Sequence, residues 1–261
     1  MADIDVNLAN PPLAPGFYLR LGAGSDWPKA NGFSDNNCSN LQPPALFGCG
    51  TGNNGQALGA SGSFEPAAVI DAAAGYRFNS WFRAEALLSW RPELEFSGQS
   101  NFLGLAGANQ PVTGSASSVA GFGVAYVDLP KVGRVRPFLG AGLGVARNRL
   151  SSVTYRFPGI AANAATVTPD GSSSGLAYLL TAGISIPLNK RLDLDLAYRF
   201  SDLGDVRTSS GQAGLSRPTL PAGTKIPYRR NPGGLAGPWG AAEFALLILN
   251  KHLKKPFKKV F

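Results

Sequence analysis

Carboxylates and arginines alternate along two stretches of the chain, at spacings that could support acid–base or metal chemistry. The residues are Arg83, Glu85, Arg91, Glu93 and Glu95 in "WFRAEALLSWRPELEF", and Asp193, Asp195 and Arg199 in "LDLDLAYRF". Paired carboxylates can act as a general acid and base, or can bind a cation. The arginines between them favour another interpretation, in which opposite charges form a structural network of ion pairs.

Other catalytic groups are scarce. The single histidine, His252, lies in the basic C-terminal segment, far from any serine that could serve as its nucleophile partner. The glycines of "GAGLGVA" lie within a strand pattern that no helix pattern follows, which argues against a dinucleotide loop. We therefore predict that the protein is not an enzyme and that it has no catalytic residue, cofactor or metal site.

Two cysteines, Cys38 and Cys49, lie in one segment rich in glycine, asparagine, serine and proline. No histidine or third cysteine is near them, so a loop-closing disulfide fits better than a metal site or free thiols. A disulfide implies an oxidising compartment. The first residues, "MADIDVNLANPPLAPG", lack the basic start and apolar core of a signal peptide, and Met1 is the only methionine. We therefore expect an exported protein whose signal peptide has been removed.

The charged residues must be held on strands. From Phe82 to Phe96 the even positions are mainly apolar and the odd positions mainly charged, and a strand sends alternate side chains to opposite faces. Similar segments predict eight strands, near 17–27, 64–77, 81–97, 117–128, 135–150, 175–188, 191–203 and 238–250. Long polar segments (28–63, 98–116, 151–174 and 204–237) alternate with tight turns, so the long and short connections lie at opposite ends of an antiparallel meander.

Composition points to a membrane. The chain is 44% hydrophobic but only 15% charged, whereas an ordinary soluble domain is about a quarter charged. No stretch approaches the roughly 18 to 20 apolar residues of a membrane-spanning helix, so strands would have to cross. The net charge of +8 is dispersed along the chain and is dense only near the C-terminus, which argues against a nucleic-acid partner.

Alternation alone does not decide which face is inside, because a lipocalin-like barrel would enclose the apolar face. The glycines Gly121, Gly123, Gly140, Gly142, Gly144 and Gly183 share the parity of the charged side chains, where they would leave room for arginine and glutamate. We therefore predict a lipid-facing apolar belt, which includes Phe122, Val124 and Tyr126, and a lumen filled by ion pairs. The predicted lumenal network comprises Arg20, Asp71, Arg83, Glu85, Arg91, Glu93, Asp193, Asp195, Arg199 and Glu243.

Two stretches, "RPFLGAGLGVA" (136–146) and "IPLNKRLDLDLAYRFSDLG" (186–204), resemble the eight-stranded outer-membrane β-barrel family, which includes opacity-type surface antigens, small outer-membrane proteins of alphaproteobacteria and the OmpA transmembrane domain. The resemblance implies an all-β fold: an eight-stranded antiparallel up-and-down transmembrane β-barrel with short periplasmic turns and long extracellular loops. It also implies residence in the outer membrane of a Gram-negative bacterium and insertion by the barrel assembly machinery. The final segment "NKHLKKPFKKVF" departs from the family, because its lysines interrupt the apolar alternation before the terminal aromatic residue.

The predicted organisation is a periplasmic N-terminal segment (1–16), a barrel (17–250) and a basic tail (251–261). The expected role is structural and surface-interacting, through envelope integrity, adhesion or contact with outer-membrane lipid and lipopolysaccharide, with any surface ligand held by the four long loops. The alternative is a narrow porin-like channel or a small-solute-binding barrel. The basic tail is either a solvated end or a site for an anionic periplasmic partner.

Overall fold

The computed structural model describes residues 15–28, 31–33, 51–52, 54–56, 58–101, 109–167, 170–189, 192–204, 214–215, 239–242 and 248–249. The long strands are β1 (Gly16–Trp27), β4 (Ala67–Arg77), β5 (Phe82–Ser100), β6 (Pro111–Asp128), β7 (Arg136–Leu150), β10 (Gly171–Asn189) and β11 (Leu192–Asp202). The short strands are β2 (Asn31–Phe33), β3 (Ala60–Phe64), β8 (Thr154–Arg156), β9 (Ala165–Val167), β12 (Gly214–Leu215), β13 (Trp239–Ala242) and β14 (Ile248–Leu249). The described part of the chain contains no helix that is long and apolar enough to span a membrane.

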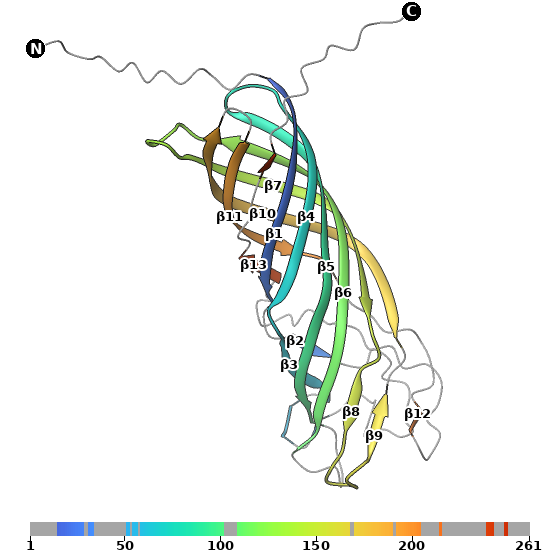
Figure 1. Ribbon diagram of the computed structural model, residues 1–261. Helices are drawn as coiled ribbons and strands as arrows, with labels where there is room; N and C mark the ends of the chain where they lie inside the picture. The colour runs from blue at the N-terminus through green and yellow to red at the C-terminus, as the bar shows by residue number, and fades with distance from the viewer. Residues whose placement is uncertain are drawn as a thin grey trace, which may run out of the picture.

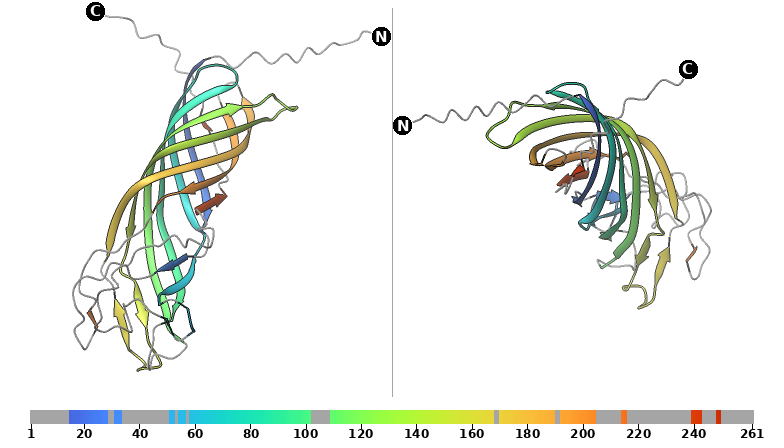
Figure 2. Two further views of the ribbon diagram at one scale, coloured as in Figure 1. Left: turned by 180° about the vertical axis from the view of Figure 1, so that it is seen from behind. Right: turned by 45° about the horizontal axis from the view of Figure 1, so that its top comes forward.

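The long strands form one antiparallel sheet that closes on itself. Neighbours pair in the order β1, β4, β5, β6, β7, β10 and β11, and β13 then pairs with both β11 and β1. β14 continues this last position by pairing with β11 near Leu192. β13 and β14 together thus supply an eighth position in the ring, and the strands wrap around a common axis (Figures 1 and 2). The predicted eight-stranded antiparallel barrel is confirmed.

β5 and β6 run on beyond the ring and carry an extension at the long-loop end (Figure 1). β3 pairs with the far part of β5, whereas β8, β9 and β12 follow β6 in turn. The extension has an apolar core of its own, formed by Leu58, Ala60, Phe64, Ala67, Leu94, Phe96, Val112, Ala116, Leu150, Val153, Tyr155 and Phe157. Burial of these side chains stabilises the extension beyond the ring.

The outer wall of the ring is apolar. Large side chains point outward with most of their surface exposed, as at Leu176 (87%), Leu143 (76%) and Phe17 (65%). Aromatic rings line the short-turn end, where the centroids of Phe17 and Tyr76 lie 4.8 Å apart and those of Tyr76 and Phe78 lie 5.0 Å apart. A continuous apolar wall with an aromatic rim is what a membrane-spanning barrel presents to lipid.

A β-bulge in β5 reverses the faces of that strand. The pairing with β6 passes from Arg91↔Ser118 to Leu94↔Ala116, so β5 contains one extra residue at Pro92 and Glu93. Proline has no N–H to donate to the ladder, which favours a bulge there. Beyond it, Leu94 is buried inside, whereas Glu93 is exposed outside. The prediction that Glu93 lies in the lumen was therefore wrong.

The prediction for β6 was also wrong. Phe122, Val124 and Tyr126 point into the barrel and are buried, whereas Gly121 and Gly123 lie on the outer wall. When a strand has aromatic residues on one face and small residues on the other, the pattern does not decide which face meets lipid and which faces the lumen. In this barrel the lumen receives the large rings, because they fill volume that glycine and alanine would leave empty.

The glycines of β7 keep their predicted inward parity but serve a different purpose. A Cβ at Gly140 would lie 2.6 Å from Cδ1 of Tyr126, closer than real side chains approach. Gly140 therefore makes room for an aromatic ring from the neighbouring strand and not for an arginine or glutamate.

Candidate functional site

The centre of the lumen is organised around Glu85 of β5. Its carboxylate accepts hydrogen bonds from the Arg20 guanidinium, from the Tyr18 hydroxyl at 3.1 Å and from the Tyr126 hydroxyl at 2.7 Å. These partners come from β1 and β6, so the cluster ties three strands together across the interior. Gly75, which pairs with Tyr18, leaves the space that the tyrosine ring occupies.

A second cluster lies toward the short-turn end, around Asp128. Its carboxylate accepts from Arg77 and also from Nε of Arg83 at 3.2 Å. Arg83 extends further, to Asp195 on β11, with 3.7 Å between Nη1 and Oδ2. The same guanidinium lies 4.5 Å from the ring centroid of Tyr126, a cation–π contact. This cluster therefore connects β4, β5, β6 and β11.

Two further ion pairs cross the lumen. Arg199 of β11 donates to Asp71 of β4 at 2.7 Å. Toward the long-loop end, Arg91 donates to Asp26, and its Nη2 donates to Ser201 Oγ at 3.3 Å. Each contact joins strands that are distant in sequence, so the charged side chains hold opposite walls together.

Hydrocarbon side chains fill the spaces between the polar clusters. The inner apolar cluster of the ring comprises Ala73, Leu87, Ala120, Phe122, Val124, Tyr126, Phe138, Ala146, Ala177, Leu179 and Leu203. Past Arg91, the core of the extension continues the filling. Ions and aromatic rings thus alternate along the axis, and an eight-stranded barrel is narrow enough for such side chains to occupy it fully.

The buried charges balance. Among the described residues, five arginines and five carboxylates are buried, each at most 8% exposed. They are Arg20, Arg77, Arg83, Arg91, Arg199, Asp26, Asp71, Glu85, Asp128 and Asp195. Each of these ions also lies in an ion pair. Pairing of this kind offsets the free-energy cost of removing the charges from water. No group of three or more potential metal ligands occurs in this part of the chain.

The structure places the predicted network residues in three groups. Arg20, Asp71, Arg83, Glu85, Arg91, Asp195 and Arg199 lie inside and are paired. Asp193 is only half-buried, near the start of β11, and Glu93 is outside. Glu243, Cys38, Cys49 and the basic tail (251–261) lie outside the described residues, so the disulfide and the role of the tail stay predictions.

Asp26 and Arg77 also lie inside, on the charged face that the sequence pattern predicts for the lumen. Three members of the lumenal clusters were not predicted to lie there: Tyr18, Tyr126 and Asp128. A signal for two of them exists in "VAYVDLP", where Tyr126 and Asp128 share a parity. Asp128 lies on the same face of β6 as Phe122, Val124 and Tyr126, and a carboxylate suits the lumen better than the lipid face. Asp128 would therefore have predicted that this face of β6 points into the lumen.

Comparison with known proteins supports the same architecture. Residues 11–217 match the model of the outer membrane protein beta-barrel domain. An uncharacterised protein of Brucella suis biovar 1 (strain 1330) is 29% identical over 219 residues, which cover 79% of this chain and 72% of the relative. One from Brucella abortus (strain 2308) is 32% identical over 152 residues, which cover 53% of this chain and 51% of the relative.

One solved structure supports the fold, and the fold alone. The outer membrane protein OprG from Pseudomonas aeruginosa aligns with a TM-score of 0.51 at 15% identity, over 90% of this chain and 95% of OprG. Neisserial surface protein A aligns over 91% of this chain and 99% of its own, with a TM-score of 0.38 and 14% identity. The family match spans seven of the eight wall positions and confirms the resemblance found in the sequence. The chain belongs to the outer membrane β-barrel family of Gram-negative bacteria.

Proposed function

We propose that this protein is a non-conducting, non-enzymatic barrel that holds a rigid surface structure in the outer membrane and acts in envelope integrity or surface interaction. The filled lumen is the observation that carries the proposal. Four ion-pair groups and the aromatic residues between them cross the interior from the short-turn end to the extension.

The energetics of the lumen support a closed state. An ion that passed through would have to displace at least one partner of a buried pair, and breaking such a pair costs about 3 to 5 kcal/mol. The pairs are stacked along the axis, so the cost recurs at several levels. Among the described residues, equal numbers of buried arginines and carboxylates also leave no excess charge to attract ions of one sign.

The extension supports a role at the surface. Its apolar core fixes the ends of β5, β6 and β7, from which long connections begin. We infer that the parts of the long segments 28–63, 98–116, 151–174 and 204–237 that lie outside this core contribute to recognition of lipopolysaccharide, of a host surface or of a neighbouring protein. A rigid base lowers the entropy that such loops lose on binding.

Conductance in planar bilayers tests the proposal. The parent protein is expected to give no current steps above the leak level. A variant with Asp26→Ser and Arg91→Ser removes one ion pair without leaving an unpaired charge, and a variant with Glu93→Ser and Glu95→Ser changes only the outer face. Reproducible steps from the parent would refute the closed state and favour the narrow channel instead.

A further inference from the structure

Two arginines stand on the outer wall where its apolar belt ends. Along β7 the outward side chains are Leu139, Leu143 and Val145, followed by Arg147 and Arg149, which are both exposed. Arg147 and Arg149 are two positions apart on one face, about 7 Å along the strand. They lie on the long-loop side, where a barrel of this family meets the head groups of the outer leaflet.

Serine side chains surround the arginine pair. Ser174 and Ser172 of β10 pair with Arg147 and Arg149, and Ser117 of β6 pairs with Arg149 from the other side. Neither arginine takes part in an ion pair within the described part of the chain. Exposed guanidinium groups beside hydroxyl groups form a suitable environment for phosphate, because both donate hydrogen bonds to its oxygens.

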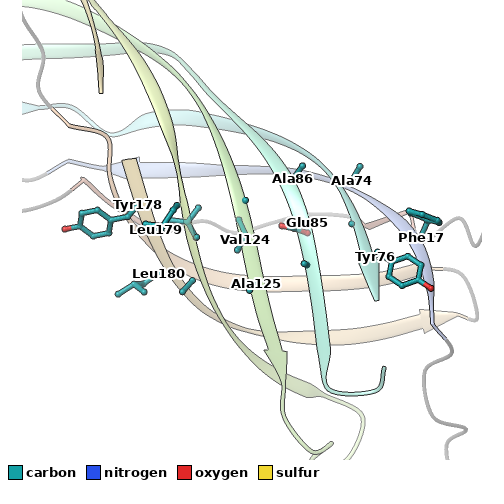
Figure 3. Close-up of a pocket in the computed structure, with 16 residues that line it drawn as sticks. Phe17, Ala74, Tyr76, Glu85, Ala86, Val124, Ala125, Tyr178, Leu179 and Leu180 are labelled. Carbon is teal, nitrogen blue, oxygen red and sulfur yellow. The ribbon is translucent and has the colours of Figure 1, made fainter. Parts of the chain in front are cut away.

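An apolar hollow lies on the same wall, beneath the arginine pair. Its volume is about 840 Å³, and its middle is lined by small outward residues, among them Ala74, Ala86, Gly123, Ala125 and Ala141. Figure 3 shows large side chains closing the hollow, with Phe17 and Tyr76 at one end and Tyr178 and Leu180 at the other.

A second hollow, of about 770 Å³, adjoins the first one on the side toward the arginines. It shares Ala74 and Ala86 with the first hollow and reaches Gly121 and Val145. Val145 is the outward residue next to Arg147 on β7. The arginine pair therefore begins one outward position beyond the rim of an apolar surface that continues into the first hollow.

We propose that this face binds a phosphate-bearing lipid of the outer leaflet, lipopolysaccharide, with its phosphate on Arg147 and Arg149 and an acyl chain in the hollow over Gly121 and Gly123. The proposal rests on the outer-membrane placement of the barrel and names a partner for its proposed surface role. The charge of the patch and its height on the wall suit a lipid head group, and the hollow suits hydrocarbon.

A second copy of the chain fits this face less well. A two-fold contact through the face would bring the arginine pairs of both copies into one interface. The carboxylates of β5 that face outward, Glu93 and Glu95, are separated from β7 by the whole of β6. Such a dimer would therefore gather like charges, whereas a phosphate neutralises them.

The test is a lipid titration of the purified full-length protein in detergent, followed by native mass spectrometry. The probe is rough lipopolysaccharide with intact phosphates, compared with the same material after enzymatic dephosphorylation. Arg147→Gln with Arg149→Gln should weaken binding of the phosphorylated probe about tenfold or more. Lys131→Gln with Arg134→Gln, in the turn at the opposite end, removes the same charge and should leave the affinity unchanged.

A separate variant tests the role of the hollow in binding the acyl chain. A Cβ at Gly123 would meet no atom within 4 Å, so the position can accept a side chain, and Gly123→Leu puts hydrocarbon into the hollow. It should weaken the binding of both probes, whereas the arginine variant should affect the phosphorylated probe alone.

Equal affinity of the parent and the double arginine variant would overturn the proposal, as would equal affinity of the parent for both probes. If the parent forms a dimer that dissociates in the arginine variant, the proposal is overturned, because a second copy of the chain and not a lipid then occupies this face. Conductance is measured separately, so a closed barrel without lipid affinity would refute this inference and leave the proposed function intact.

Discussion

Replacing Glu85 by alanine is the most direct perturbation of the lumenal network. The substitution removes the acceptor shared by Arg20, Tyr18 and Tyr126. Arg20 is 5% exposed, so its charge would remain in the interior without a carboxylate partner. Leaving a buried ion uncompensated costs about 3 to 5 kcal/mol, and we expect the free energy of unfolding to fall by that amount.

Urea unfolding of the barrel refolded in lipid vesicles, followed by tryptophan fluorescence, measures this loss. Glu93→Ala is the matched control, because Glu93 is exposed on the outer face of the same strand and should change stability by no more than about 0.5 kcal/mol. Glu85→Gln retains one acceptor oxygen, so its free energy of unfolding should lie between those of the parent and the alanine variant. Equal losses for Glu85→Ala and Glu93→Ala would refute the assignment of the network to the lumen.

Three further outcomes are expected. Leu143→Arg should lower the free energy of unfolding in vesicles by about 2 to 4 kcal/mol, because it puts a charge at bilayer depth. A site exposed to water would tolerate the arginine, so unchanged unfolding would contradict the lipid-facing wall. Gly140→Ala should cost about 1 to 3 kcal/mol by crowding the adjacent tyrosine ring, while Gly123→Ala on the outer wall should be neutral, and urea midpoints compare the two. If Cys38 and Cys49 form the predicted disulfide, its reduction should leave barrel unfolding unchanged; two free thiols by mass measurement of protein from outer membranes would remove the bridge.

The sequence alone was sufficient for the architecture. Period-two alternation identified the strands, and the alternation of long and short connections implied a meander with two unlike ends. In β7 and β10 the outward residues Leu139, Leu143 and Leu180 lie where the pattern places them. These strands have a strongly apolar face opposite a face made mainly of small or polar residues, so the difference in transfer energy between the faces leaves one orientation in the membrane.

The same pattern could not orient every strand. In β6 both faces lack charges over most of the strand, with Phe122 and Tyr126 on one side and Gly121 and Gly123 on the other. In β5 the bulge at Pro92 changes the parity of every residue after it, and alternation read from the first half of the strand then misplaces Glu93.

Only the tertiary structure decided which charges meet. Arg20 and Glu85 are 65 residues apart in sequence, and Arg199 and Asp71 are 128 residues apart. Their contact depends on how the strands are staggered around the ring and on which glycine leaves room for which ring. Alternation along a single strand determines the face of a side chain, but the partner across the lumen is set by the register of all the strands between them.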